Sequence, residues 1–467
     1  MNKIILFELN EVPIRIIDYF CLMRPNSWLA MNYDNLRKFE SYCENKGHLS
    51  PWNTWPSLHR GVLNERHLIS DFNQNLTDVD ADFPPIWKIL SKNKIKTGVF
   101  GSLHSYPLPS EKEKYSFYIP DVFAAGSECY PKNVELFQDI NLRLSRVSAR
   151  NVDSSIPYKE MLKLFGHVGS LGFRAKTILD VAGHLVKERL TKWKAIRRRT
   201  YQTVISFDVY LKLLKKEKPD FSTFFTNHVA SSQHRYWAAL FPDEYKNLEY
   251  DNEWIATYQN EILFTMEKTD RMLRLLANFV NCNEDYKLLI TSSMGQEAVE
   301  CEPMETQLYI TDNAKFFNML GIPSGGYEIL PTMMPEFNYK VNDYIYFRKK
   351  LDTFKINGET VKYKELGDGR FRIDLGQQNL KTLNIEINQK VVLIENSGLE
   401  NVEIEDKSSS TAYHIPEGHF FVYHPTYQKT KVSKEQVSTQ QIMPTILKNF
   451  ALPVPSYAQK PNLSILG

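Results

Sequence analysis

Apolar residues occur along this chain in short continuous runs separated by longer amphipathic stretches. The first run covers residues 4–9, and polar residues follow at its carboxyl end. Runs of this length without alternation are typical of parallel strands buried on both faces. Three further strands are predicted on the same grounds, at residues 96–100, 221–226 and 286–291.

Helical patterns lie between these runs. The longest covers about residues 253–279, where Ile262, Met266, Leu273 and Leu276 recur at helical spacing. Strands that alternate with helices predict an α/β fold with a mostly parallel central sheet flanked by helices. Ligands of such sheets bind beyond the carboxyl ends of the strands.

Two segments interrupt the alternation. Residues 135–217 are rich in helical patterns and predict a helical insertion, a candidate cap. Residues 338–410 alternate apolar and polar types at 344–347, 371–374 and 383–387, with turn signals such as Asn357-Gly358. That pattern predicts a small antiparallel β module. The α/β core would then comprise residues 1–337 and 411–467.

The charge balance changes this picture only locally. Of 467 residues, 42% are hydrophobic and 24% are charged, which is ordinary globular composition, and the net charge is +2. Basic residues gather at 192–199 and 212–218, inside the predicted helical insertion. Such runs are usually solvated helix faces, but they also suit peripheral contact with a membrane or an anionic glycan. Nucleic acid is not expected as a partner.

Cysteine usage and the N-terminus bear on the compartment. The five cysteines are scattered, without a CxxC pair, which argues against a disulfide framework or a structural zinc site. The first residues lack the apolar core and cleavage site of a signal peptide, and no stretch reaches the ~20 apolar residues that span a bilayer. A soluble cytoplasmic protein is therefore expected.

Five short motifs follow one another in the regions where site residues belong. They are Thr54-Trp-Pro-Ser57, His234-Arg-Tyr-Trp237, Ile290-Thr-Ser-Ser-Met-Gly295, His414-Ile-Pro-Glu-Gly418 and Pro444-Thr-Ile-Leu447. In this order they resemble the alkaline phosphatase superfamily, in its type I phosphodiesterase/nucleotide pyrophosphatase branch. The resemblance implies an alkaline phosphatase-like fold and, in typical members, two divalent cations beside a Thr or Ser nucleophile.

Several positions that hold acidic metal ligands in the family are neutral in this chain. The Asp of an Asp-Gly pair after the first strand is Asn10, with Glu11 at the Gly. The Asp and His of a Ser-Asp-His-Gly segment are Ser293 and Met294, and another Asp is Ala230. One cation would sit among neutral groups and a soft thioether, so we expect the two-metal site to be lost.

The other cation position keeps more of its ligands. The resemblance retains His234 and His414, and His228 lies two residues before Ala230. Three imidazoles with an open position suit zinc, and without metal they suit general acid–base catalysis. We therefore expect no metal or one divalent metal, with zinc as one option. The predicted catalytic residues are Thr54, His228, His234 and His414, of which the three histidines are also the predicted metal ligands.

The remaining predicted site residues are assigned to substrate binding. They are Asn10, Glu11, His59, Arg60, Arg235, Ser293 and Met294. Structural alternatives stay open for the main candidates. Thr54 before Pro56 is also typical of a helix cap, and His234 and His414 are also compatible with hydrogen-bonded core histidines.

Three functional hypotheses follow. The first is an atypical enzyme that transfers or cleaves a phosphate-linked group on a carbohydrate-related substrate, such as a nucleotide sugar or a surface-polysaccharide precursor. The second is a binding or regulatory pseudoenzyme of the same fold. The third is an ordinary two-metal phosphodiesterase whose substitute ligands are Glu8, Glu11, His228 and Glu297.

Overall fold

The computed structural model describes residues 2–71, 74–146, 151, 166, 168–332, 336–428 and 432–467. The chain divides into two compact units. The first unit comprises Met1–Leu142, Pro157–Cys301 and Ser410–Gly467. The second comprises Arg143–Ile156 and Glu302–Ser409.

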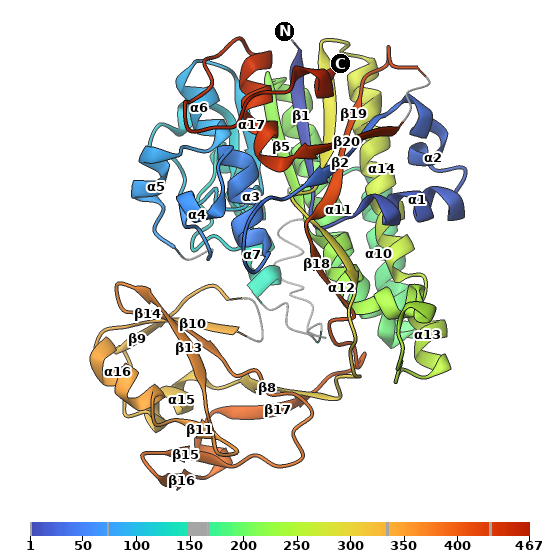
Figure 1. The fold of residues 1–467 in the computed structure, drawn as a ribbon. Helices are drawn as coiled ribbons and strands as arrows, with labels where there is room; N and C mark the ends of the chain where they lie inside the picture. Colours follow the sequence, from blue (N-terminus) through green and yellow to red (C-terminus); the bar gives the residue numbers. More distant parts are fainter. Residues whose placement is uncertain are drawn as a thin grey trace. The chain divides into compact units, whose positions relative to one another are not determined.

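An eight-stranded sheet forms the centre of the first unit (Figure 1). Its order is β20-β2-β19-β6-β1-β5-β3-β4, and among these strands only β19 runs against its neighbours. The predicted mostly parallel sheet is therefore confirmed. The strands are β1 (Lys3–Leu9), β2 (Arg37–Tyr42), β3 (Thr97–Phe100), β4 (Tyr115–Ile119), β5 (Phe221–Thr226), β6 (Tyr286–Thr291), β19 (Glu417–Tyr423) and β20 (Val432–Ser438).

The central position of β1 in the sheet explains why its sequence is a continuous apolar run. It pairs with β5 on one side and β6 on the other, in parallel register. Ile4 and Leu6 belong to the core cluster on one face of the sheet, whereas Phe7 stacks on Phe224 at 5.6 Å. Both faces of β1 are thus covered, and burial of both faces removes any need for polar alternation.

One face of the sheet carries α3 (Pro51–Arg60), α6 (Ile86–Lys92) and α17 (Thr439–Asn449) (Figure 1). The start of α3 is fixed by its sequence. Ser50 is the N-cap of a capping box with Asn53, Pro51 occupies the first turn, and Gly61 ends the helix at φ +64°. These are the residue types that favour such ends, and they hold α3 beside the end of β1.

The helices of the other face lie on the opposite side of the sheet in Figure 1. They are α1 (Ile14–Met23), α2 (Trp28–Asn32), α10 (Ala175–Leu190), α11 (Arg198–Glu217), α12 (His228–Leu240), α13 (Asn252–Tyr258) and α14 (Glu261–Asn281). The single helix predicted at 253–279 is therefore two helices. The other helices are α4 (Asn64–His67), α5 (Thr77–Asp82), α9 (Val168–Leu171) and α7 (Glu135–Arg146), of which α7 crosses into the second unit at Arg143.

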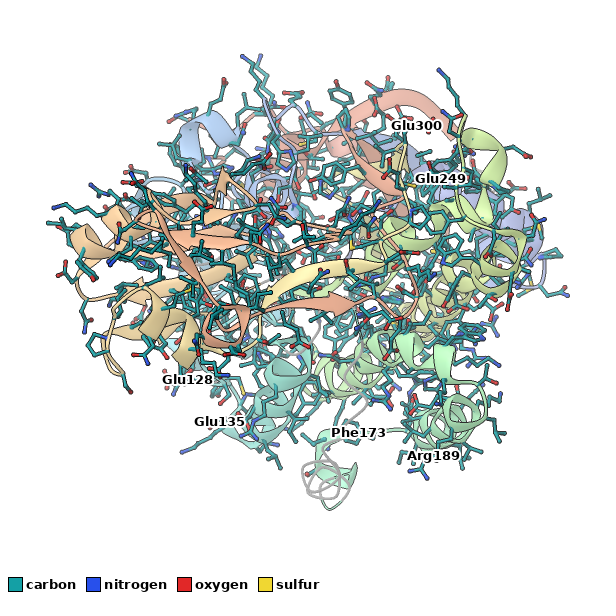
Figure 2. All side chains as sticks on the ribbon, turned by 90° about the horizontal axis from the view of Figure 1, so that it is seen from below. Glu128, Glu135, Phe173, Arg189, Glu249 and Glu300 are labelled. Carbon is teal, nitrogen blue, oxygen red and sulfur yellow. The ribbon has the colours of Figure 1, made fainter. Side chains whose placement is uncertain are left out.

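The segment predicted as a helical cap belongs largely to this layer. Within α11, the hydroxyl of Tyr210 lies 3.0 Å from that of Ser222 on β5, and both side chains are buried. The end of the segment therefore packs on the sheet. Part of its basic run is also paired, since Arg198 binds Glu188 and Arg197 binds Glu261. Arg189 lies at the periphery, near the end of α10 (Figure 2).

The second unit contains three small antiparallel sheets around its own core. Its longer segment begins at Glu302, whereas the sequence analysis places the start of the β module at 338. Its sheets have the orders β13-β14-β10-β9, β12-β11-β15-β16 and β17-β8. The strands are β8 (Thr306–Ile310), β9 (Tyr327–Ile329), β10 (Glu336–Val341), β11 (Lys355–Ile356), β12 (Glu359–Thr360), β13 (Lys362–Gly367), β14 (Arg370–Asp374), β15 (Ile385–Ile387), β16 (Lys390–Val392) and β17 (Leu399–Glu403).

One predicted strand of this unit is wrong. Residues 344–347 begin a helix, α16 (Tyr344–Leu351), which follows α15 (Asn313–Met319). The side chain of Asp343 caps α16 by accepting the N–H of Tyr346 at 3.0 Å, and Phe347 and Leu351 are its buried residues. That four-residue spacing is helical, and the short aromatic run concealed it. The turn predicted at Asn357-Gly358 is confirmed, with φ of +50° and +86° joining β11 to β12.

No helix among the described residues combines the length and apolar character that crossing a bilayer requires.

Candidate functional site

The candidate site lies just past the carboxyl ends of β1, β5 and β6. Asn10 and Glu11 follow β1, α12 begins right after β5, and Ser293 and Met294 follow β6. A small antiparallel pair, β7 (Gly295–Ala298) and β18 (Ala412–Ile415), places His414 opposite Gln296. Parallel packing thus brings distant segments to one edge of the sheet, where ligands of α/β sheets bind.

Three side chains converge at this edge. Nε2 of His234 lies 2.9 Å from Oε2 of Glu11, and Nε2 of His414 lies 3.3 Å from the same oxygen. One ligand atom from each residue falls within 4.8 Å of the other two. We call this set the Glu11 triad. It is the one group of this kind in the described parts of the chain.

Both imidazoles are oriented by the backbone. Nδ1 of His234 lies 2.8 Å from the carbonyl of Ala412, and Nδ1 of His414 lies 2.8 Å from the carbonyl of Leu49. A carbonyl only accepts, so each Nδ1 carries a proton, and in the neutral ring Nε2 then has a lone pair. Two such lone pairs facing one carboxylate need a positive charge between them, supplied by a metal cation or by protons on the rings.

Glu11 itself is held from several sides. Asn10 Nδ2 donates to Oε1 at 2.7 Å, and Gln296 Nε2 donates to Oε2. The backbone carbonyl of Glu11 accepts from Gln233 Nε2 at 2.8 Å. Its φ is +58°, a region that favours glycine, which is the residue that the family resemblance has at this position. The backbone and these hydrogen bonds therefore hold the Glu11 carboxylate toward His234 and His414.

The electrostatics of the triad follow from burial and charge. Burial alone would raise the pKa of Glu11, but His414 and His234 beside it bring that pKa well below its usual range. Burial would lower the pKa of His414, and the Glu11 carboxylate raises it instead. The carboxylate is therefore charged, and it favours a cationic partner at the two Nε2 atoms.

The other family metal position, which the sequence analysis expects to be lost, is occupied by neutral side chains that hydrogen bond to one another. Thr54 Oγ1 lies 2.8 Å from Ser293 Oγ, and both side chains and that of Met294 are fully buried. Asn10 is also engaged, since its Oδ1 accepts from Trp55 Nε1 and its Nδ2 donates to Asn227 Oδ1, each at 2.7 Å. These neutral groups bond to one another and bring no formal charge that would hold a second divalent cation.

His228 lies outside the triad. It is buried at the start of α12, where its Nε2 lies 3.1 Å from Thr269 Oγ1 and 3.2 Å from the carbonyl of Thr265. Burial lowers its pKa to about 4, so it stays neutral near pH 7. The third ligand position beside His234 and His414 is therefore taken by Glu11 and not by His228, which the sequence analysis predicts there.

Two of the predicted substrate-binding residues are enclosed in the core. His59 pairs with Glu8 at 2.7 Å, and both are buried. Arg60 is buried and binds Asp80 at 2.7 Å. Arg235, next to His234 on α12, is partly buried. Of the substitute ligands considered in the sequence analysis, Glu297 is exposed on β7 and does not join the triad.

Sequence reasoning missed an aromatic rim beside the triad. The ring centroid of Tyr413 lies 4.4 Å from that of His414 and 5.9 Å from that of His234, and Tyr413 is 40% exposed. The exposed His48 lies near by, with Nε2 3.4 Å from the Tyr413 hydroxyl. The sequence gives one indication of this rim: Tyr413 directly precedes His414, which matches a family histidine.

Comparison with known proteins gives similarity of architecture. No family model matches the chain, and neither does any curated protein. Among solved structures, mouse ectonucleotide pyrophosphatase/phosphodiesterase 5 matches with 9% identity over 98% of this chain and 97% of its own, at a TM-score of 0.40. Phosphonoacetate hydrolase from Sinorhizobium meliloti, in complex with phosphonoacetate, matches with 12% identity over 95% of this chain and 94% of its own, at a TM-score of 0.42.

A second structure of the mouse protein also matches. This inactive variant, in complex with AMP, matches with 9% identity over 99% of this chain and 97% of its own, at a TM-score of 0.40.

Proposed function

We propose that this protein is an enzyme that cleaves or transfers a phosphate-linked group with one divalent cation held by Glu11, His234 and His414. The observation that carries the proposal is the convergence of the three ligand atoms within 4.8 Å, with both Nδ1 atoms bound to carbonyls. A hydrogen bond at the far nitrogen is the usual way that proteins orient a ligating histidine. Two imidazoles, one carboxylate and an open position suit zinc best.

Each residue of the site has a separate part in this proposal. A bound zinc ion would act as a Lewis acid toward a phosphoryl oxygen and would activate water at neutral pH. Glu11 supplies the single negative charge, so that a divalent ion in the triad leaves the site net positive and attractive to phosphate. Asn10 and Gln296 fix the two carboxylate oxygens.

Thr54 is assigned a positioning role. Its hydroxyl is fully buried and bonded to Ser293, so a substrate phosphorus would not reach it without rearrangement of α3. A threonine hydroxyl is also a weak nucleophile without a base or metal beside it. We therefore propose that water or an acceptor hydroxyl attacks, and that Thr54 and Ser293 keep the second metal position closed.

For the substrate we propose a carbohydrate-related phosphate, such as a nucleotide sugar or a surface-polysaccharide precursor. The half-exposed ring of Tyr413 supports this class, because a flat aromatic face beside the triad suits stacking of a sugar or a base. The groups on either side of the scissile phosphate would then contact Tyr413 and His48.

Metal content and activity test the proposal together. Protein purified without chelator should carry one equivalent of zinc by elemental analysis, and should hydrolyse a nitrophenyl phosphodiester or release nucleotide from nucleotide sugars. Chelator should abolish turnover and zinc should restore it.

Glu11→Ala, His234→Ala and His414→Ala should each lose metal and activity. His424→Ala removes a partly buried histidine outside the triad and is the matched control. Full turnover in all three triad variants would refute the proposal.

A binding protein without catalysis is the second candidate. It is favoured by the burial of Thr54 and by the raised pKa of His414, since protons alone would satisfy the contacts between the imidazoles and Glu11. In that case the protein binds no stoichiometric metal, and it binds nucleotide sugars without turning them over. The Glu11→Gln variant would then keep the fold and weaken ligand binding without any effect of chelator.

A further inference from the structure

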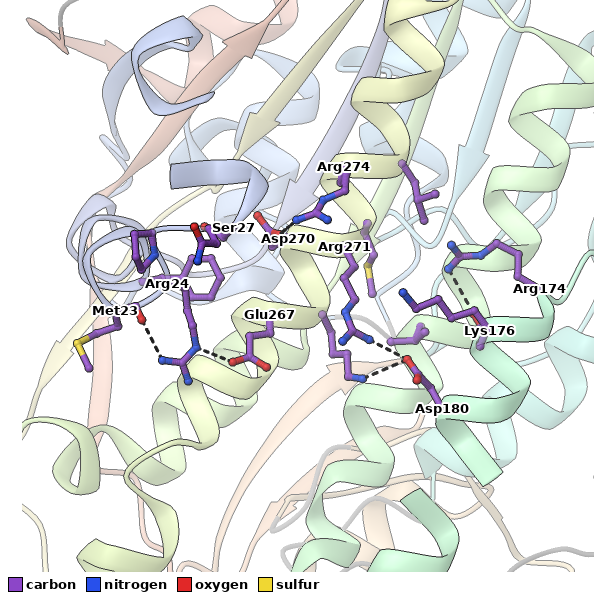
Figure 3. Close-up of a pocket in the computed structure, with 18 residues that line it drawn as sticks. Met23, Arg24, Ser27, Arg174, Lys176, Asp180, Glu267, Asp270, Arg271 and Arg274 are labelled. Carbon is purple, nitrogen blue, oxygen red and sulfur yellow. Dashed lines mark hydrogen bonds and ion pairs between the residues drawn. The ribbon is translucent and has the colours of Figure 1, made fainter. Parts of the chain in front are cut away.

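A second pocket lies in the first unit and shares no residue with the Glu11 triad. It is a cavity of about 650 Å³ between the end of α1, the loop before α2, the start of α10 and the middle of α14 (Figure 3). That volume is in the range of small-molecule sites. Phe20, Met23 and Met272 give its wall an apolar part.

The rest of the wall is unusually basic. Six cationic side chains line it against three carboxylates, Asp180, Glu267 and Asp270. The six are Arg24, Arg174, Lys176, Lys268, Arg271 and Arg274. This excess is local, because the whole chain has a net charge of only +2.

The carboxylates of the wall are already engaged. Glu267 binds Arg24 at 2.7 Å, and Asp180 binds Arg271 at 2.7 Å (Figure 3). Asp270 lies 3.4 Å from Arg274, but its two oxygens also accept backbone N–H groups at the start of α2, at 3.1 and 2.8 Å. Part of the positive charge is therefore left without a full counter-charge.

Lys268 and Lys176 carry that surplus. Lys268 is buried, and its Nζ lies 3.6 Å from the Asp180 oxygen that Arg271 already binds. Burial and the neighbouring Arg271 lower the pKa of Lys268, as expected where positive charge accumulates. Lys176 reaches toward the same space from the first turn of α10 (Figure 3) and has no ion pair with a described carboxylate.

The start of α10 already has an anionic partner within the protein. The helix spans Ala175–Leu190, and its N-cap residue, Arg174, makes no side-chain cap. The buried carboxylate of Asp208 lies at this helix start, where it accepts the backbone N–H of Arg174 at 2.8 Å and binds the Arg174 guanidinium at 2.6 Å. A carboxylate at a helix N-terminus is the usual partner of its dipole, so Arg174 and this helix start are satisfied, and the surplus positive charge lies with the lysines of the pocket.

We propose that this pocket binds a phosphate-bearing ligand, with Lys176, Lys268 and Arg271 contacting the phosphate oxygens and the apolar wall covering the rest. Several converging cations suit a polyvalent phosphate better than a single carboxylate. The ligand is either a free phosphorylated metabolite or the headgroup of an anionic lipid. Both present the same phosphate chemistry to the pocket.

Titration calorimetry of the full chain with inorganic pyrophosphate tests the proposal. The same titration on His414→Ala separates this pocket from any binding at the triad. Lys176→Glu should weaken binding at least tenfold, and Arg271→Gln should do so as well. Lys187→Glu makes the same charge change at an exposed position of α10 outside the pocket, and should leave affinity within about twofold.

Vesicles distinguish the two sources of phosphate. If the ligand is a lipid headgroup, the protein sediments with phosphatidic acid vesicles but not with phosphatidylcholine vesicles, and pyrophosphate and Lys176→Glu each abolish the sedimentation. If it is a free metabolite, pyrophosphate binds and vesicles do not. The proposal is overturned if neither probe binds, or if Lys176→Glu binds pyrophosphate as tightly as Lys187→Glu does.

Discussion

The hydroxyl of Thr54 lies 2.8 Å from the hydroxyl of Ser293, and both side chains are fully buried. Thr54 comes from α3 and Ser293 from the loop after β6, so this bond joins two segments that the family resemblance assigns to a metal position. In this chain the bond closes that position with neutral groups. Two predictions follow for Thr54, one on stability and one on turnover.

Thr54→Val keeps the shape of the side chain and removes its hydroxyl. We expect the free energy of unfolding to fall by about 1–3 kcal/mol, because Ser293 is left with an unpaired buried hydroxyl. Ser293→Ala should cost a similar amount, and the double variant should cost less than the sum of the two. Denaturant unfolding of the four proteins measures this coupling.

The same variant tests the positioning role in catalysis. If Thr54 does not attack phosphorus, Thr54→Val keeps kcat within roughly threefold of the parent protein. Single-turnover kinetics on a nitrophenyl phosphodiester would measure it. A loss of more than about a hundredfold, at unchanged metal content, would instead mark Thr54 as the nucleophile.

Metal binding should stabilise the fold through the triad. The ligands come from the turn after β1, from α12 and from β18, which are far apart in the sequence, so an unfolded chain does not present them together. Zinc at about 100 times its dissociation constant should raise the free energy of unfolding by about 2.7 kcal/mol. His414→Ala should abolish this gain and His424→Ala should retain it. Thermal unfolding with and without chelator checks both, and a gain that survives in His414→Ala would place the metal elsewhere.

Gln296 should tune the triad without being a ligand. Its amide donates to Oε2 of Glu11, the oxygen that both imidazoles face. Gln296→Leu should weaken zinc binding by about 10- to 100-fold, as loss of such supporting hydrogen bonds usually does. A competition titration with a chromogenic chelator gives the affinity. Unchanged affinity would mean that Asn10 alone is enough to orient Glu11.

The sequence predicted the layers of the fold more surely than the contents of the site. Runs such as residues 221–226 and 286–291 coincide with β5 and β6, because burial on both faces leaves an unmistakable apolar run. The helix at Tyr344–Leu351 escaped prediction because four residues alternate as readily in a strand as in a short helix. Boundaries of the second unit depend on tertiary packing, which no local pattern encodes.

Within the site, the pattern led to His234 and His414 but assigned Glu11 to substrate binding, and named it as a metal ligand only in the third hypothesis. Motif spacing put Glu11 where the family has glycine, and only the left-handed backbone shows its carboxylate turned toward the imidazoles. His228 was favoured by its place after a strand, yet its first helical turn directs the ring inward to Thr265 and Thr269. Gln296 joins the site through the β7–β18 register, which is a long-range relationship.

Acid should destabilise the fold through histidines that are buried in the neutral form. His419 is fully buried, its Nδ1 lies 2.7 Å from the carbonyl of Val12, and burial lowers its pKa to about 4. In the unfolded chain its pKa returns to about 6.5, so below that pH the unfolded state binds a proton that the folded state does not. Stability from this group is complete above pH 6.5 and falls as the pH drops toward 4, by up to about 1.4 kcal/mol per pH unit and about 3 kcal/mol in all. Denaturant unfolding between pH 7 and 4 should therefore show a shallower loss in His419→Gln than in the parent protein. The control His424→Gln, at a histidine that is only partly buried, should follow the parent. Equal slopes for all three proteins would contradict a neutral, buried His419.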